Sequence, residues 1–313
     1  MGRSRESKSV DIQSWKETLR VRFLPQWFGV ALLWCCAQLP YTWLKKLGEG
    51  LGIVAYYLAR QRSHVARVNI ALCFPEISAL EQEQLVKRCI QENTIGLFES
   101  AFAWWGKPEK LRSKIDVIGM ENIERAQESG VGVLLVGAHY SNLDLGGVMV
   151  SLCVPIDVTY RRHNNPLFDY LVRQGRKRFF QQVIERSALR TMLRGLKRGG
   201  VLWYAADQDY GRKHSVFAPF FGVEAATLSG TAKLAKMTGA AVIIVGHHRK
   251  QDGRFEVEFS KPLTNFPSGD DCADAAQVND ALEQQIRKYP EQYMWVHRRF
   301  KTQKDGNKGH HYD

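Results

Sequence analysis

The sequence lacks the usual marks of a disulfide-stabilised, zinc-binding or serine-hydrolase protein. Its six cysteines are scattered over 313 residues without a C-x-x-C motif, so we expect no disulfide framework and a reducing setting for the folded part. Ser141 lacks the surrounding G-x-S-x-G elbow that exposes a nucleophilic serine. No second histidine stands at metal-ligand spacing from His139. We therefore expect neither a metal nor another cofactor.

Acidic residues are also scarce. Lys and Arg number 44 against 32 Asp and Glu, which favours an anionic partner such as nucleic acid, a phosphorylated lipid, an acidic carrier protein or a membrane surface. Residues 161–198 carry eleven Lys or Arg and only two acids, Asp169 and Glu185. We do not expect nucleic acid as the partner, because no recognised binding motif accompanies the charge and the aromatic residues cluster in apolar surroundings.

Charge is absent altogether from residues 23–44, which include three tryptophans. As one helix these 22 residues would span about 33 Å, enough for a bilayer core. Pro25, Pro40 and two glutamines interrupt the apolar run, so a helix lying in the membrane plane is the alternative. We expect a basic leader over residues 1–22, a membrane-associated hydrophobic segment over 23–47, one catalytic domain over 48–302 and a polar tail over 303–313.

The remaining chain alternates between strand-like and helix-like segments. This alternation predicts an α/β sandwich with a largely parallel central sheet, preceded by the hydrophobic membrane-associated helix. The aromatic cluster ending the helix expected over 80–105 is interpreted as core packing rather than as an acyl-chain wall. An apolar loop over 215–222 is expected either to line a lipid channel or to be buried under the sheet. Strands are predicted at 131–136, 155–160, 200–206, 240–246 and 254–259, and helices at 142–152, 166–180, 187–198 and 224–237.

The segment VGVLLVGAHYSNLDLGG, residues 131–147, carries the strongest candidate chemistry. An apolar strand leads directly into His139, and Asp144 follows five residues later. On one continuous helix these side chains would be roughly 140° apart, so the pair must bracket a turn. We expect Asp144 to fold back onto His139 and fix its tautomer, so that the free ring nitrogen takes a proton from a hydroxyl. A surface hydrogen bond without catalytic meaning is the alternative.

Two further residues are candidates for substrate binding. Arg176 lies with Arg173 and Lys177 at helical spacing, which indicates a cluster that contacts a phosphate. Asp207 ends another predicted strand, near the place where His139 emerges if the sheet is parallel. A carboxylate there can bind a metal, orient an arginine or cap a turn. We expect Asp207 to hold Arg176.

These motifs together resemble the lipid A biosynthesis late acyltransferase family, most of all its lauroyl-type members, over residues 27–302. The resemblance rests on GAHYSNLDLGG, YRRHNNPLFDYLVRQGRKRF, WYAADQDYG, SVFAPFFG and PEQYMWVHRRFKT. It assigns His139 and Asp144 to catalysis and Arg176 and Asp207 to substrate binding, with no metal. Lauroyl-type members carry Glu where this chain has Asp144. The resemblance therefore supports the pair His139 and Asp144 but gives weaker support for any acyl-chain preference.

The resemblance implies transfer of a fatty acyl group, lauroyl or similar, from acyl carrier protein to a hydroxyl on an acyl chain of a lipid A precursor, with or without Kdo sugars. It further implies the inner membrane, with the catalytic domain on its cytoplasmic face. Two alternatives remain open at this point. The chain could acylate another glycolipid, or it could be a non-catalytic membrane lipid-binding protein.

Overall fold

The computed structural model describes residues 18, 21–306 and 310–313. The basic leader expected over residues 1–22 therefore lies almost entirely outside the described residues, as do residues 307–309 of the expected polar tail.

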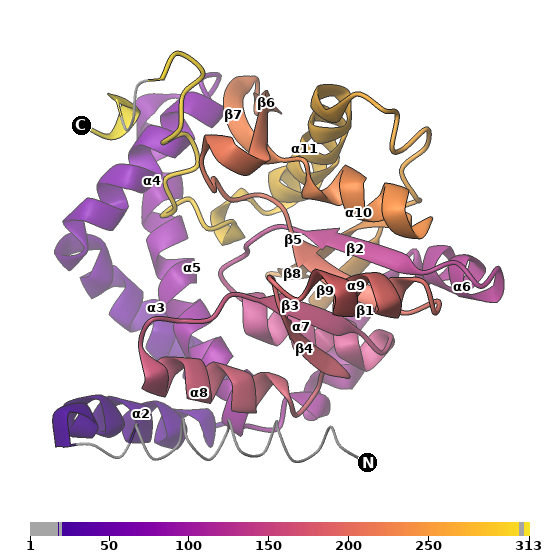
Figure 1. Ribbon diagram of the computed structural model, residues 1–313. Helices are drawn as coiled ribbons and strands as arrows, with labels where there is room; N and C mark the ends of the chain where they lie inside the picture. Colours follow the sequence, from indigo (N-terminus) through magenta and orange to yellow (C-terminus); the bar gives the residue numbers. More distant parts are fainter. Residues whose placement is uncertain (1–17, 19–20, 307–309) are drawn as a thin grey trace.

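A seven-stranded sheet forms the centre of the molecule, in the order β1-β9-β8-β2-β5-β3-β4 (Figure 1). Neighbouring strands are parallel except for the antiparallel pair β8–β9, so the predicted largely parallel sheet is confirmed. The strands are β1 (Ile115–Ile118), β2 (Val133–Gly137), β3 (Asp157–Tyr160), β4 (Gln182–Glu185), β5 (Val201–Ala205), β8 (Ala241–Arg249) and β9 (Phe255–Phe259).

Helices cover both faces of this sheet because its strands are apolar on both sides. In β2, Leu134 and Val136 enter one core cluster, whereas Val133 and Leu135 enter the other. The first cluster is completed by α9 (Leu189–Leu196), α10 (Gly230–Thr238) and α11 (Asp271–Lys288). The second cluster includes α6 (Met120–Glu128) and α7 (Leu143–Cys153).

A long helix, α5 (Ala79–Trp105), lies beside the sheet and contacts α7 (Figure 1). Ser78 and Glu81 begin it with a reciprocal capping box. At its other end Phe98, Phe102 and Trp104 are buried in the second core cluster, so the core-packing interpretation is confirmed. Beside α5 lie α4 (Arg60–Cys73) and α8 (Pro166–Arg176).

The uncharged N-terminal segment forms two helices rather than the single helix considered above. α2 (Leu24–Ala37) ends before Pro40, which is the N-cap of α3 (Tyr41–Leu58). Proline removes a backbone donor and favours an extended residue before it, so a helix is interrupted there. Among the residues that the structure describes, no helix has the length and hydropathy needed to cross a membrane. The helix expected to span is therefore not confirmed.

The other departures from prediction lie in short segments. Residues 224–237 were expected as one helix, but β7 (Val223–Leu228) pairs antiparallel with β6 (Ser215–Phe220), and α10 begins only at Gly230. Periodicity does not distinguish a short buried apolar run in a strand from one in a helix. The expected apolar loop over 215–222 is thus mainly β6. Its Phe220 and Phe221 are buried, which favours the burial alternative over the lipid channel.

Candidate functional site

A cavity of about 880 Å³ opens at the carboxyl edge of the sheet, where β2, β3, β4 and β5 end. Open α/β sheets bind their ligands at this edge. Two of the predicted site residues, His139 and Arg176, line this cavity. Its wall combines apolar and aromatic side chains with further arginines.

The register of two neighbouring strands brings His139 and Asp207 together. Gly137 at the end of β2 pairs with Ala205 at the end of β5, and each candidate stands two residues beyond its strand. Asp207 Oδ1 lies 2.6 Å from His139 Nδ1, and Asp207 Oδ2 accepts the backbone N–H of His139 at 2.9 Å. The carboxylate therefore holds both the ring and the backbone of His139. Nε2 is the ring nitrogen left for a substrate.

The environment of Asp207 keeps it ionised. Burial by itself raises the pKa of its carboxyl, but the charge of His139, the two hydrogen bonds from His139 and the charge of Arg299 outweigh burial and lower the pKa to about 2. Burial and the Asp207 carboxylate raise the pKa of Tyr293, so this neighbouring hydroxyl remains protonated. An ionised carboxylate on Nδ1 favours the tautomer in which Nε2 carries a lone pair.

Arg176 pairs with Asp144 instead of Asp207. Arg176 Nε donates to Asp144 Oδ1 at 2.8 Å. The pairing that the sequence predicted is thus exchanged: Asp207 contacts His139, and Asp144 contacts Arg176. Asp144 lies in the first turn of α7, facing the last residue of α8, whereas Asp207 lies beside His139 at the adjacent strand end.

Elements distant in sequence fix the turn that carries His139. The backbone N–H of Met294 donates to His139 O at 3.0 Å, and Ser141 N–H donates to Gln292 O at 2.7 Å. On the other side α5 approaches through Gly96, where an added Cβ would lie 2.0 Å from Ser141 O. The C-terminal segment and α5 therefore hold the turn between them.

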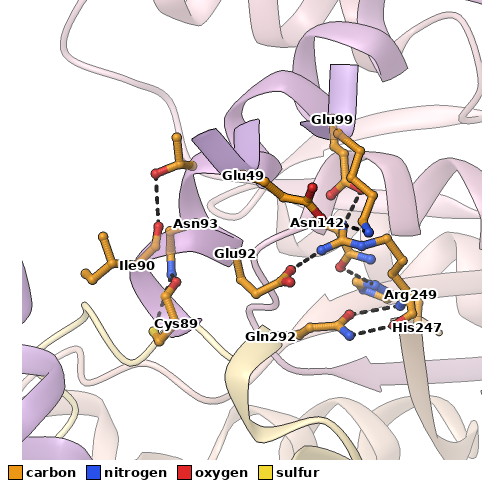
Figure 2. A network of polar contacts seen from close by, with 12 residues as sticks. Glu49, Cys89, Ile90, Glu92, Asn93, Glu99, Asn142, His247, Arg249 and Gln292 are labelled. Atoms are coloured by element: carbon orange, nitrogen blue, oxygen red, sulfur yellow. Dashed lines mark hydrogen bonds and ion pairs between the residues drawn. The ribbon is translucent and has the colours of Figure 1, made fainter. Parts of the chain in front are cut away.

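Behind this turn lies a buried ionic network, drawn in Figure 2. Arg249, at the end of β8, forms ion pairs with Glu92 and Glu99 of α5. Tyr41 of α3 donates to Glu99 at 2.5 Å, and Gln292 bonds to the backbone of Arg249. This network joins α3, α5, β8 and the C-terminal segment. Beside it, His247 Nδ1 lies 3.1 Å from Asn142 Oδ1, the N-cap side chain of α7.

Three arginines of the cavity were not singled out by the sequence. Arg161 and Arg162 follow β3, and Arg186 follows β4, so all three lie at strand ends that border the cavity. Of the predicted cluster of Arg173, Arg176 and Lys177, the cavity wall contains only Arg176. The excess of basic residues over 161–198 and the strand predicted over 155–160 were the available signals for Arg161 and Arg162. The placement of Arg186 depends on β4, which was not predicted. Within the described ranges, no group of three or more His, Cys, Asp or Glu is arranged to hold a metal ion.

Comparison with known proteins extends this picture. Residues 13–302 match the model of the family described as bacterial lipid A biosynthesis acyltransferase. The chain is 40% identical to the lipid A biosynthesis palmitoleoyltransferase of Escherichia coli, over 93% of this chain and 95% of the relative. It is 39% identical to the lipid A biosynthesis lauroyltransferase of the same organism, over 92% of this chain and 95% of the relative.

Among solved structures, the 1-acyl-sn-glycerophosphate acyltransferase of Thermotoga maritima aligns with a TM-score of 0.35 and 18% identity, covering 79% of this chain and 98% of that one.

Proposed function

Because the chain belongs to the bacterial lipid A biosynthesis acyltransferase family, we propose that it moves a fatty acyl group from acyl carrier protein to a hydroxyl on an acyl chain of a lipid A precursor. The observation that carries the proposal is the 2.6 Å contact between His139 Nδ1 and Asp207 Oδ1 at the edge of a cavity that also contains Arg176. Such a contact prepares a general base, and the neighbouring cations suit an anionic substrate.

The reaction proceeds by direct transfer. His139 Nε2 removes the proton from the acceptor hydroxyl, and the oxygen attacks the thioester carbonyl to form a tetrahedral intermediate. Asp207 stabilises the imidazolium that results. Collapse of the intermediate forms the new ester and breaks the C–S bond, and His139 returns its proton to the departing thiolate. The thiol and the acylated lipid are the products, and no acyl-enzyme forms.

The beginning of α7 can receive the negative charge that develops on the carbonyl oxygen. Its N-cap residue, Asn142, makes no side-chain cap hydrogen bond, since its Oδ1 contacts His247 instead. Helix N-termini favour anions through their backbone N–H groups and the helix dipole. Asn142 lies three residues after His139, and α7 follows it directly. The helix N-terminus and His139 would therefore act on neighbouring atoms of the substrates, the carbonyl oxygen and the hydroxyl.

We assign recognition of the acceptor to the arginines of the cavity. Arg161, Arg162, Arg176 and Arg186 border the same space, and guanidinium groups bind phosphates and carboxylates with paired hydrogen bonds. A lipid A precursor offers phosphates, and Kdo sugars, where present, add carboxylates. Asp144 then acts through Arg176 by fixing its guanidinium, which makes Asp144 a positioning residue rather than the partner of His139.

The acceptor's acyl chains also require contact with a membrane. The two N-terminal helices expose many large apolar side chains, among them Phe28, Trp34, Trp43 and Leu51. Exposed apolar area on this scale is typical of a membrane or protein interaction site. We propose that α2 and α3 attach the protein to the cytoplasmic face of the inner membrane.

The donor's acyl chain is best tested directly. We propose lauroyl or a chain of similar length, although the palmitoleoyl- and lauroyltransferase relatives match almost equally well, at 40% and 39% identity. Purified protein is incubated with a lipid A precursor and with carrier proteins that bear acyl chains of different lengths. The masses of the lipid products are then measured by mass spectrometry. We expect the mass of one acyl chain to be added, fastest near lauroyl. No mass gain with any donor would contradict the proposed function.

A further inference from the structure

A basic surface lies beside the cavity on α9 and α10, which contact one another (Figure 1). Arg190 and Arg194 are four residues apart on α9, and Lys197 and Arg198 continue the same exposed face directly after its end. Lys236 adds a cation from α10. These five residues define the α9–α10 basic surface. Neither helix contains an acidic residue.

The fold itself does not use these charges. The side of α9 opposite them buries Met192 and Leu196 in the core. In the described part of the chain, none of the five cations forms an ion pair. Elsewhere on the surface cations do find acids, as Lys304 does with Glu224. Lys233, also on α10, pairs with Asp271 at 3.8 Å and is not counted in this surface. The five cations of the α9–α10 basic surface are available to a partner.

The position of this surface suits a protein that delivers a substrate into the cavity. Arg186 and Ser187 border the cavity, and α9 begins two residues later at Leu189. The eight residues of α9 extend the basic surface by about 12 Å away from the cavity. Leu189 and Met237 are 44% and 48% exposed on the same two helices. Apolar side chains beside charged ones are typical of a protein–protein interface.

A membrane is less favoured as the partner of this surface. Figure 1 places α9 and α10 at the right of the molecule and the apolar helices α2 and α3 at its lower left. A protein on α9 and α10 and a membrane on α2 and α3 can thus be engaged at once.

We propose that the α9–α10 basic surface docks the acidic carrier protein, an inference that rests on the carrier-dependent function proposed above. Docking there brings the acyl thioester to the cavity entrance at Arg186, with His139 in the same cavity. Each exposed ion pair contributes little by itself, so several cations must act together. Charges at the rim of an interface act mainly on the rate of association and its dependence on salt.

The test compares two donors that carry the same acyl chain: acyl carrier protein, and phosphopantetheine without the protein. Arg190→Glu/Arg194→Glu reverses two cations of the surface. Lys87→Glu/Arg88→Glu, on the exposed part of α5, changes the net charge equally and serves as the matched control. For Arg190→Glu/Arg194→Glu we expect kcat/KM with the carrier-bound donor to fall about tenfold or more at low salt. The small donor should remain within about twofold, which also shows that the variant is folded.

Donor kinetics at high salt and binding to lipid vesicles test the same inference further. The deficit should shrink towards 1 M salt, where the Debye length falls to about 3 Å, and binding to vesicles containing anionic lipid should stay unchanged. Equal losses with both donors, or an equal loss in the control, would overturn the inference. So would reduced vesicle binding with intact donor kinetics, which would assign the surface to the membrane. If the unchanged protein transfers nothing from carrier protein, the proposed donor fails as well. If it transfers and charge reversal has no effect, only the docking surface fails.

Discussion

Two carboxylates at one cavity each pair with a nitrogen-bearing side chain, and the chain holds the two pairs to different degrees. Asp207 is 1% exposed and His139 18%, and their contact includes a backbone hydrogen bond. Arg176 and Asp144 are 15% and 12% exposed and meet through Nε alone. The first pair is fixed in orientation, as a general base must be. The second leaves further guanidinium N–H groups for an anionic ligand, as a substrate contact must.

The largest expected effect is the loss of the base itself. His139→Ala should reduce kcat by about a thousandfold or more, because general base catalysis contributes about 10²–10⁴-fold and orientation adds to it. Single-turnover transfer from acyl carrier protein measures the effect. The far-ultraviolet circular dichroism spectrum should be unchanged. Substantial turnover by a folded His139→Ala protein would refute the assigned base.

Asp207→Asn should follow, with a fall in kcat of about a hundredfold or more and little change in either KM. The amide keeps the shape of the side chain but cannot stabilise imidazolium or hold the correct tautomer. Steady-state kinetics with both substrates separate the two constants. A variant that changes KM alone would mean that Asp207 binds substrate, as the sequence had suggested.

Arg176→Ala should raise the KM for the lipid acceptor by about tenfold or more and leave the KM for the donor nearly unchanged. Losing a charge-assisted hydrogen bond removes about 1.5–3 kcal/mol of binding. Varying each substrate at saturation of the other measures the difference. The opposite pattern would assign Arg176 to the donor.

Asp144→Asn should have the smallest effect, a rise of about threefold in the same KM. Arg176 remains present but loses its anchor, so only the ordering of its side chain suffers. Asp144→Glu, which restores the charge on a longer arm, should recover most of the activity. A loss in kcat as large as that of Asp207→Asn would instead indicate that Asp144 is the carboxylate partner of His139.

These two pairs also mark how far the sequence could predict the structure. The buried strands follow from the apolar runs, and their parallel arrangement follows from the alternation of strands with helices. The position of His139 at a strand end follows because the apolar run ends at residue 136. The pairing does not, because it depends on the register of β2 against β5. Five residues of separation suggested that Asp144 lies beside His139, whereas Asp207, 68 residues away, is held there by the sheet.

Short segments were unpredictable for a different reason. β4 has four residues and β7 six, too few for hydrophobic periodicity to distinguish a strand from a helix. Their strand conformation comes from partners elsewhere in the chain, β3 and β6. Without β4 the cavity position of Arg186 could not be foreseen.

The most direct test of the central claim is the protonation of the His139 ring, measured by nitrogen-15 NMR on histidine-labelled protein and assigned by comparison with His139→Ala. The account predicts that the neutral ring carries its proton on Nδ1 and leaves Nε2 free, a tautomer that Asp207→Asn abolishes and Asp144→Asn preserves. A tautomer that survives Asp207→Asn but is lost in Asp144→Asn would contradict it.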